Sequence, residues 1–419
     1  MQRTQVNFSA LTWLLILSLV FFAAESRIPG ASTTASGQEG SPGSLAAMAI
    51  NWLFIGFCIS RRMSGLFSQC WKNKYIFALP ALALLSATWS QDPSRTLLKA
   101  ACLILLTIFA VSFVNHYDHR ETMHILYSVG VIVVMTSFLF CIAAPSIGTE
   151  FGSYNGAWRG IFVSKNDAAR VVLFLLPAVL CIRPQSRLAG IARYCHISAS
   201  LIFIALTRSV TGIAATFALL ALFFASAALR RTAKVEKLLL AVVVLTAFIG
   251  IAALIYLNAS TILPWFGRDT TLTGRTKIWA SVLLSIAKRP WLGYGHGAFW
   301  IGRGEAINTD VAANWDVSYA HNGYLDVLLQ LGVAGLALVV YLLVKASFKL
   351  YTYLQKEFSA YSIWCLATLL LTILFNLDES TFLLEQRIYW ILFLLVSLSL
   401  NQRNESEINA APMRQWHRH

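Results

Sequence analysis

The stretch Tyr319–Gly335, YAHNGYLDVLLQLGVAG, changes abruptly from polar and aromatic residues to apolar ones. Its first half puts His321, Asn322 and Tyr324 at the start of a segment whose second half has the composition of a membrane helix. Polar groups at the boundary between a wet loop and a bilayer suit a ligand with one polar part and one lipid part. The stretch therefore predicts a membrane helix with functional side chains at its N-terminal end.

The composition of the whole chain agrees with this prediction. Of the 419 residues, 57% are hydrophobic and 12% are charged, and the mean hydropathy is +0.64. A soluble protein cannot cover that much apolar surface, whereas a bilayer can. About twelve apolar segments have spanning character, and each should be helical because lipid cannot satisfy an open backbone. Their centres are near Leu15, Leu53, Ala83, Leu106, Val134, Leu175, Phe203, Leu220, Phe248, Val340, Leu370 and Leu394. We predict an all-α, polytopic integral membrane protein with a long outward loop between helices 9 and 10.

The basic residues predict the orientation of the chain. With a cytoplasmic N-terminus, the inward loops collect most of the Lys and Arg, and the short outward loops hold far fewer, which is the positive-inside pattern. The net charge of +14 is therefore mainly a topology signal and does not indicate nucleic-acid binding. Met1–Ala24 is expected to be a retained first helix, because Ala23-Ala24-Glu25 is a poor cleavage site. All seven cysteines fall in predicted helices or on the inward side, so no disulfide framework is expected. No metal site is expected either, because the sequence has no CxxC motif or Cys/His cluster.

Two outward segments, 146–167 and 259–321, are longer than connectors need to be. The second holds Arg275, Lys277 and further basic residues against the positive-inside trend, and an anionic ligand on the outer face would explain them. Thr276–Lys288 is apolar on one side at helical spacing, which predicts an interfacial helix. The three glycines of Gly293–Trp300, GYGHGAFW, predict a tight turn or a close backbone approach.

Three further cations lie at predicted outer boundaries. Arg208 is in a short hairpin between two helices, ALTRSVTG, where it either snorkels to the surface or binds a ligand. Arg159 and Lys165 belong to WRGIFVSKND, just before the sixth helix, and the alternatives there are interface anchoring and ligand binding.

The order of these motifs resembles the O-antigen ligase and Wzy polymerase superfamily of bacterial membrane glycosyltransferases. The resemblance is carried by TRSVTG, by LTGRTKIWASVL followed by RPWLGYGHGAF, and by AHNGYLDVLLQLGVAGL, over roughly Ile197–Val344. WRGIFVSKND is similar to a segment of the exopolysaccharide branch named for ExoQ, although Ser164 stands where that branch often has His. The resemblance divides the chain into N-terminal transmembrane helices (1–196), a ligase-like region (197–344) with a periplasmic loop (259–321), and C-terminal transmembrane helices with a cytoplasmic tail (345–419).

The resemblance implies transfer of a glycan from undecaprenyl diphosphate to a sugar hydroxyl, with inversion and without a metal or cofactor. Arg208 and Arg275 would bind the diphosphate, and His321 would be the catalytic residue. Arginine suits the first task because its planar fork pairs with phosphate oxygens. Histidine suits proton transfer because its unperturbed pKa is about 6.5. Arg159, Lys165, Asn322 and Tyr324 are candidate substrate-binding residues; Asn322 and Tyr324 could instead cap the helix.

Other assignments stay open at this stage. Asp326, one helical turn below His321, could orient the imidazole or pair with an arginine, and His296 is a second candidate base. The acceptor would be a lipid-linked glycan in a polymerase, and lipid A–core or a protein in a ligase. The ExoQ-like segment favours polymerisation. Other polysaccharide assembly proteins are expected partners, and the site should face the periplasm from the inner membrane. A flippase for the same lipid-linked glycan is the alternative from another class. A glycosidase with paired carboxylates would use a pair among Asp310, Asp316, Asp378, Glu379 and Glu385.

Overall fold

The computed structural model describes residues 8–24, 42–229, 275–302, 304–314, 317–356 and 358–410. These residues form helices and loops, and their only extended pairing is an isolated antiparallel bridge between Thr149 and Trp158. The all-α prediction is confirmed for this part of the chain. The predicted helix near Phe248 lies outside the described residues.

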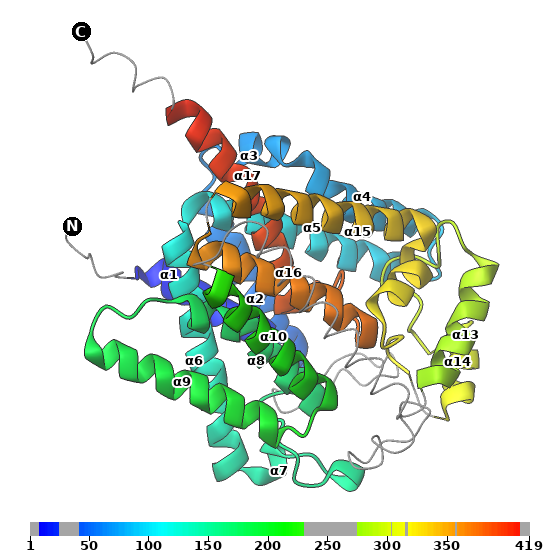
Figure 1. Ribbon diagram of the computed structural model, residues 1–419. Helices are drawn as coiled ribbons and strands as arrows, with labels where there is room; N and C mark the ends of the chain where they lie inside the picture. Colours follow the sequence, from blue (N-terminus) through cyan, green and yellow to red (C-terminus); the bar gives the residue numbers. More distant parts are fainter. Residues whose placement is uncertain are drawn as a thin grey trace.

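The helices follow one another along the chain from the N-terminal α1 to the C-terminal α17 (Figure 1). They are α1 (Ala10–Ala24), α2 (Pro42–Ser60), α3 (Leu66–Lys72), α4 (Ala78–Leu85), α5 (Pro93–His116), α6 (His119–Ala143), α7 (Pro145–Gly148), α8 (Lys165–Cys181), α9 (Arg187–Leu206), α10 (Val210–Leu229), α13 (Arg275–Lys288), α14 (Ala306–Ala313), α15 (Gly323–Lys356), α16 (Ala360–Asp378) and α17 (Ile388–Ala410). Short 3-10 turns cover Lys74–Phe77, Ser86–Thr88 and Gly152–Tyr154.

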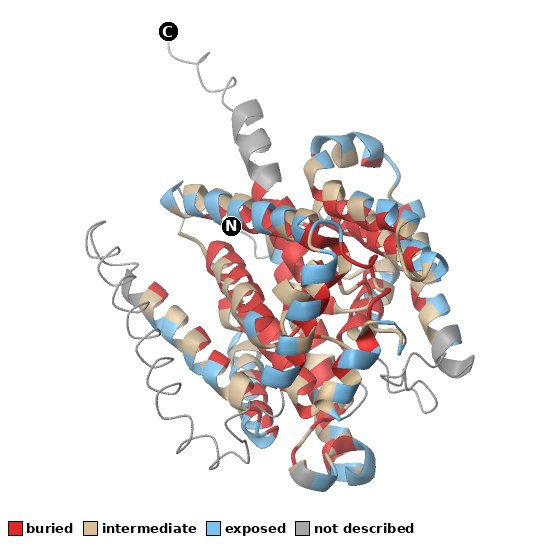
Figure 2. Ribbon diagram, turned by 90° about the vertical axis from the view of Figure 1, so that its right-hand side faces the viewer, coloured by how far each residue is buried: buried red, intermediate tan, exposed pale blue. Residues whose placement is uncertain are grey.

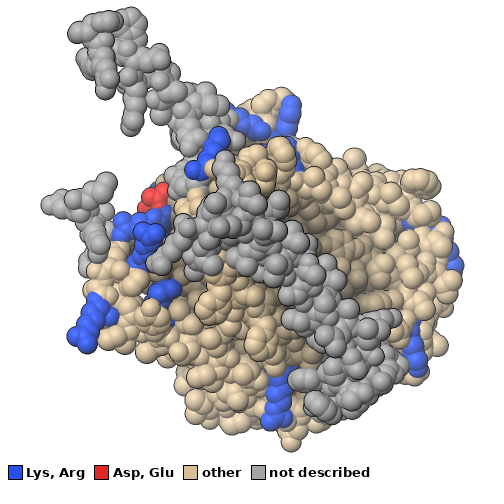
Figure 3. Space-filling view, in the orientation of Figure 1, with Lys and Arg blue, Asp and Glu red and all other residues tan. Residues whose placement is uncertain are grey.

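Five of the described helices, α5, α6, α9, α15 and α16, are long and apolar enough to cross a membrane. Shorter apolar helices occupy Ala10–Ala24, Ala46–Ser60, Lys74–Thr88, Val210–Ser226 and Ile388–Leu400. Broad parts of the face in Figure 3 carry few charged side chains, as a lipid-facing surface should. These features fit an integral membrane protein, while the count of about twelve spans and the placement of the long loop stay predictions.

Helix α8 lies in the middle of the bundle and packs against α6, α9, α10, α16 and α17. Nearly every one of its side chains is buried, and Figure 2 shows burial concentrated where the central helices meet. The helix nevertheless carries Asp167 and Arg170 in its first two turns. Two charges inside a bundle need partners, and those partners come from the loops at the same end of α8.

The ends of the bundle differ. Figure 1 shows α13 and α14 together at the end where α15 begins, whereas α1 and the end of α17 lie toward the other end. The helix predicted over Thr276–Lys288 is confirmed as α13, which begins at Arg275 and buries Ile278 and Val282 inside the protein, while its position at the bilayer surface stays a prediction. The start of α8 and the end of α16 lie near α13 and the start of α15. Segments from four parts of the chain therefore meet at this end of the bundle.

Helix α15 is broken at Gly332, where the backbone is left-handed (φ 62°, ψ −162°). The loop after α13 fills the break: Val333 N–H donates to Pro290 O at 2.8 Å, and Tyr294 N–H donates to Leu329 O at 2.8 Å. A Cβ at Gly332 would lie 2.2 Å from the carbonyl carbon of Trp291. The break was not predicted from the sequence. The hydrogen bonds from the loop after α13 satisfy backbone groups that the break leaves unpaired inside the helix.

The predicted close approach of the GYGHGAFW segment is confirmed. Gly293, Gly295 and Gly297 all have positive φ. A Cβ at Gly295 would lie 2.5 Å from Ser90 Oγ, and one at Gly297 would lie 2.2 Å from Lys99 Cδ. The segment therefore ties the loop that carries α13 to the start of α5 as well as to α15.

Candidate functional site

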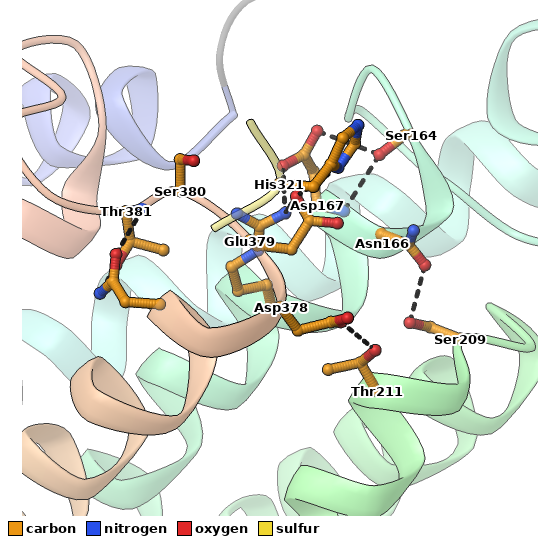
Figure 4. A network of polar contacts seen from close by, with 12 residues as sticks. Ser164, Asn166, Asp167, Ser209, Thr211, His321, Asp378, Glu379, Ser380 and Thr381 are labelled. Carbon is orange, nitrogen blue, oxygen red and sulfur yellow. Dashed lines mark hydrogen bonds and ion pairs between the residues drawn. The ribbon is translucent and has the colours of Figure 1, made fainter. Parts of the chain in front are cut away.

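Glu379 is the centre of a buried charged cluster, although it was not among the predicted site residues. It is 2% exposed and follows directly after α16. Arg275 Nη2 donates to its Oε1 at 2.8 Å, Arg170 Nη2 lies 3.4 Å from its Oε2, and His321 Nδ1 lies 3.3 Å from the same Oε2. Figure 4 shows His321, Glu379 and Asp167 side by side, with Asp378, the last residue of α16, below them.

Backbone contacts hold this cluster together. Glu379 leaves α16 in an extended conformation, and its carbonyl accepts from Gly323 N–H, the first residue of α15, at 3.2 Å. A Cβ at Gly323 would lie 1.8 Å from Asn376 Oδ1, so only glycine lets α15 begin this close to the end of α16. His321, two residues earlier, adopts a left-handed backbone (φ 50°) that is uncommon for histidine. The close join of two helix ends thus fixes where the imidazole lies.

The cluster balances its charges within a buried space. Arg170, 3% exposed, also contacts Asp167 Oδ1 at 3.1 Å, and Arg387 Nη1 lies 3.8 Å from the same oxygen. Burial alone would raise the pKa of Glu379, but Arg170, His321 and Arg275 outweigh it and hold that pKa at about 2. Glu379 is therefore a carboxylate at neutral pH, and it can accept hydrogen bonds on both oxygens.

His321 is only partly buried, with 15% of its side chain exposed. Its ring lies 4.4 Å from that of Tyr319, which packs against it. A carboxylate facing Nδ1 favours the tautomer with the proton on Nδ1, because the carboxylate can only accept. That tautomer leaves the lone pair on Nε2, where a base needs it.

Arg275 belongs to the cluster as its motif predicted, but its guanidinium already has two partners. Nη2 faces Glu379, and Nη1 donates to the carboxylate and to the carbonyl of Asp378. Asp378 has 31% of its side chain exposed, and it also accepts from Thr211 Oγ1, in the first turn of α10. Of the two acidic partners of Arg275, Asp378 is the one that a solvent-borne anion can replace.

Arg208 lies on the turn between α9 and α10, beside the cluster and exposed. Its Nη1 lies 3.5 Å from Asn155 O, and its own carbonyl accepts from Lys165 Nζ at 3.3 Å. The next residue, Ser209, donates to Asn166 Oδ1 at 2.8 Å. The described contacts thus join this turn to the start of α8, without joining the Arg208 guanidinium to Glu379.

Arg159 and Lys165 hold the loop between α7 and α8. Arg159 Nε donates to Ile147 O at 2.9 Å, and its Nη1 lies 3.4 Å from Glu150 Oε2. Lys165 N–H donates to Glu150 Oε1 at 2.8 Å, and its Nζ lies 3.7 Å from the centre of the Tyr154 ring. Both cations are buried in this arrangement, and substrate binding by either stays a prediction.

Asn322 and Tyr324 flank the start of α15. Asn322 Oδ1 accepts from the N–H groups of Tyr324 and Leu325, both at 3.1 Å, which caps the helix. Tyr324 OH donates to Ile373 O at 3.4 Å. Helix capping by Asn322 is therefore seen, and contact of either residue with a sugar stays a prediction.

Asp326 does not have the role suggested by its spacing from His321. Its carboxylate accepts from Trp300 Nε1 at 2.7 Å, from Ala320 N–H at 3.0 Å and from Ser380 Oγ. These bonds hold the loop before His321 against the loop after α16. The residue that faces the imidazole is Glu379 instead, because the loop after α16 comes between α8 and the start of α15.

His296, the second candidate base, lies in another buried cluster. Its Nδ1 lies 2.9 Å from Gln330 Oε1 and its Nε2 lies 4.0 Å from Glu385, which pairs with Lys99 at 2.9 Å. Burial lowers the pKa of His296 to about 4. With both ring nitrogens inside the protein, His296 is poorly placed to meet an acceptor.

Arg170 is the residue that sequence reasoning should have found. It stands alone among apolar residues in the stretch 168–181 of α8. An ionisable side chain within a predicted membrane helix is by default a candidate functional residue with a buried partner. That partner, Glu379, is far away along the chain, and no local signal identifies it.

Known proteins share part of this sequence. Residues 196–340 match the family described as O-antigen ligase. The chain is also 26% identical over 293 residues to the exopolysaccharide production protein ExoQ of Rhizobium meliloti (strain 1021), covering 65% of this chain and 64% of that relative. The match thus spans slightly less than two thirds of the relative's length. The motif-based resemblance to this family is confirmed, and the family segment contains Arg208, Arg275 and His321, whereas Arg170 and Glu379 lie outside it.

Proposed function

We propose that this protein is a membrane glycosyltransferase that moves a glycan from undecaprenyl diphosphate to the hydroxyl of an acceptor sugar. The observation that carries the proposal is the His321–Glu379 pair, which lies at the end of membrane helices among buried arginines. Such a pair can take a proton from a hydroxyl while nearby cations take up the charge of a diphosphate. The membrane helices beside it suit the polyprenyl tail of the donor.

The proton step uses Nε2 of His321, the ring nitrogen that does not face Glu379. With its Nδ1–H donated to Glu379, Nε2 accepts the proton of the acceptor hydroxyl as the new bond forms. Glu379 then stabilises the imidazolium, as a carboxylate beside a histidine base does in other enzymes. Glu379 is a positioning residue in this scheme, since it acts through His321.

The bond changes balance without another reactant. The acceptor oxygen forms a bond to the anomeric carbon, the bond from that carbon to the diphosphate oxygen breaks, and undecaprenyl diphosphate leaves with the electron pair. Attack from the side opposite the diphosphate inverts the anomeric centre. A metal ion is not required by this scheme, because arginines supply the positive charge that the leaving group needs.

Two arginines are assigned to the diphosphate. Arg208 is exposed on the turn beside the cluster, and it can meet a phosphate without breaking a buried contact. Arg275 becomes available if the diphosphate replaces the partly exposed Asp378 on Nη1, while Glu379 stays on Nη2. Arg159, Lys165, Asn322 and Tyr324 then border the space for the sugars.

Polymerisation of exopolysaccharide or O-antigen repeat units is the process we favour. The ExoQ relative is an exopolysaccharide production protein, and WRGIFVSKND is similar to a segment of that branch. The acceptor would then be another lipid-linked glycan, the enzyme would lie in the inner membrane with the site facing the periplasm, and other polysaccharide assembly proteins would be its partners. A ligase that transfers to lipid A–core is the alternative within the same chemistry, and a flippase is the alternative from another class.

The test uses cells that lack their own copy of the protein, complemented with wild type, His321→Ala or His116→Ala at matched membrane levels. His116 is an exposed histidine at the end of α5 and is the control. Undecaprenyl-linked glycans and surface polysaccharide are extracted and sized. Loss of polymer with accumulation of single lipid-linked repeat units is expected for His321→Ala alone. Accumulation of long lipid-linked chains would instead indicate a ligase, and wild-type behaviour of His321→Ala would contradict the catalytic assignment.

A further inference from the structure

A second polar region lies at the other end of the same helices. A cavity of about 860 Å³ is bordered by the first turns of α6, the end of α8 with the segment after it, and the start of α16. Its basic lining residues are His119, Arg120, His124 and Arg183. None of the described residues that line it is acidic.

The cavity is well separated from the His321–Glu379 cluster. Helix α8 begins beside that cluster at Lys165 and reaches the cavity with Cys181, while α16 begins at the cavity with Ala360 and ends at Asp378. The 17 residues of α8, at about 1.5 Å each, put the two regions about 25 Å apart. The positive-inside pattern predicts that this end faces the cytoplasm. In Figure 3 Lys and Arg gather toward the left edge, the end where α1 lies in Figure 1.

The rest of the cavity wall is mostly apolar and aromatic, with Gln185 and Ser359 as its other polar side chains. Met123, Ile182 and Phe358 line it, and the Tyr361 ring stacks on His119 with 3.7 Å between the ring centres. A smaller cavity of about 610 Å³ continues past His119, Arg120 and Tyr361. The smaller one includes Asp118, whose carboxylate already accepts from Glu121 N–H at 2.7 Å as the cap of α6.

The ligand that fits such walls has an anionic head and an apolar body. Arg120 and Arg183 come from different segments, so a phosphate between them could bind both. The first turn of α16, which has no acidic residue, adds the partial positive charge of a helix N-terminus. Basic pockets between membrane helices on the cytoplasmic side are suited to anionic lipid headgroups.

We propose that this cavity binds the phosphate headgroup of an anionic phospholipid from the cytoplasmic leaflet. A phospholipid is favoured over a free phosphate because part of the wall is apolar and because the cavity lies at the ends of two membrane-spanning helices, α6 and α16. The proposal does not depend on the reaction at His321, since the two regions share no lining residue.

The experiment titrates phosphatidylglycerol into the purified full-length protein in a neutral detergent and follows binding by native mass spectrometry. The test variant is Arg120→Gln/Arg183→Gln. The control is Arg61→Gln/Arg187→Gln, which removes the same charge from two exposed arginines outside the lining. Each basic residue near an anionic lipid surface contributes roughly a fivefold factor in affinity, so the test variant should raise the dissociation constant about 25-fold and the control should leave it within twofold.

A second variant tests the proposal if Arg120→Gln/Arg183→Gln fails to fold. Ile182→Trp keeps every charge and fills the cavity, and it should also abolish saturable binding of phosphatidylglycerol. Phosphatidylcholine should not compete with phosphatidylglycerol for the wild-type protein. Unchanged binding in a folded Arg120→Gln/Arg183→Gln protein or in Ile182→Trp would overturn the proposal. Competition by inorganic phosphate as strong as by phosphatidylglycerol would assign the cavity to a soluble anion and overturn the lipid assignment.

Discussion

Replacing Glu379 by glutamine tests how the imidazole of His321 is controlled. The glutamine would keep the shape of the side chain and an oxygen that can face Nδ1, but it would remove the negative charge at 3.3 Å. A hydrogen bond to a charged group contributes about 1.5–3 kcal/mol. At about 1.4 kcal/mol for each tenfold change, Glu379→Gln should lower kcat by about 10- to 150-fold.

The assay measures transfer with a purified lipid-linked donor and the protein reconstituted in bilayer discs. Glu305→Gln is the matched control, because Glu305 lies in the same outer region but pairs with the exposed Lys288. The control should keep kcat within twofold. Glu379→Asp retains the charge and should recover part of the lost rate, whereas a change in KM for the acceptor is not expected from loss of proton transfer alone.

The substitution also disturbs Arg170 and Arg275, which lose a buried partner, so stability has to be separated from catalysis. A double-mutant comparison with His321→Ala achieves this. If Glu379 acts through His321, adding Glu379→Gln to His321→Ala should lower the residual rate little further. Independent, multiplicative losses in a protein that stays folded would refute the positioning role and leave Glu379 as a structural partner of the arginines.

Two further predictions concern Asp378 and the break in α15. Asp378→Asn should lower KM for the donor several-fold, because a neutral amide competes less well than a carboxylate with the diphosphate for Arg275 Nη1; a raised KM would contradict that exchange. Gly332→Ala should lower the melting temperature in detergent and cost more than about 2 kcal/mol, since alanine would need a left-handed backbone and its Cβ would collide with the Trp291 carbonyl group. Gly56→Ala, in α2 with no atom within 4 Å of the added Cβ, is its control and should be neutral or stabilising, and equal losses in both would argue against the docked break.

Prediction from the sequence succeeded where the residues that determine a structural feature lie close together in the chain. The apolar segments predicted helices because a bilayer allows few other structures, and the described helices agree. The motif around His321 predicted a histidine just before a membrane helix, and α15 begins two residues later. The three glycines of GYGHGAFW predicted a close approach of backbone, and this was correct because a missing Cβ is a local property.

The partner of His321 could not be predicted in the same way. Five outward carboxylates were available in sequence, and the choice among them depends on where α16 ends relative to α8 and α13. Asp326 has the helical spacing to reach His321, but its carboxylate is bound by Trp300 and Ser380 from other segments. A long-range contact between two helix ends therefore decided the question, and spacing within one helix could not.

The charges of the cluster also limit how an anionic donor can enter. Arg275 is already matched by Glu379 and Asp378, so a diphosphate added without any exchange would bring further negative charge beside two carboxylates. Displacement of Glu379 would remove the partner of His321 at the moment when the base is needed. Displacement of Asp378 avoids this cost, because Asp378 is partly exposed and its other partner, Thr211, lies three residues from Arg208 on the same turn. Donor binding at Arg275 would then release Thr211 and reach the turn that carries Arg208, as expected if the two arginines belong to the proposed diphosphate site.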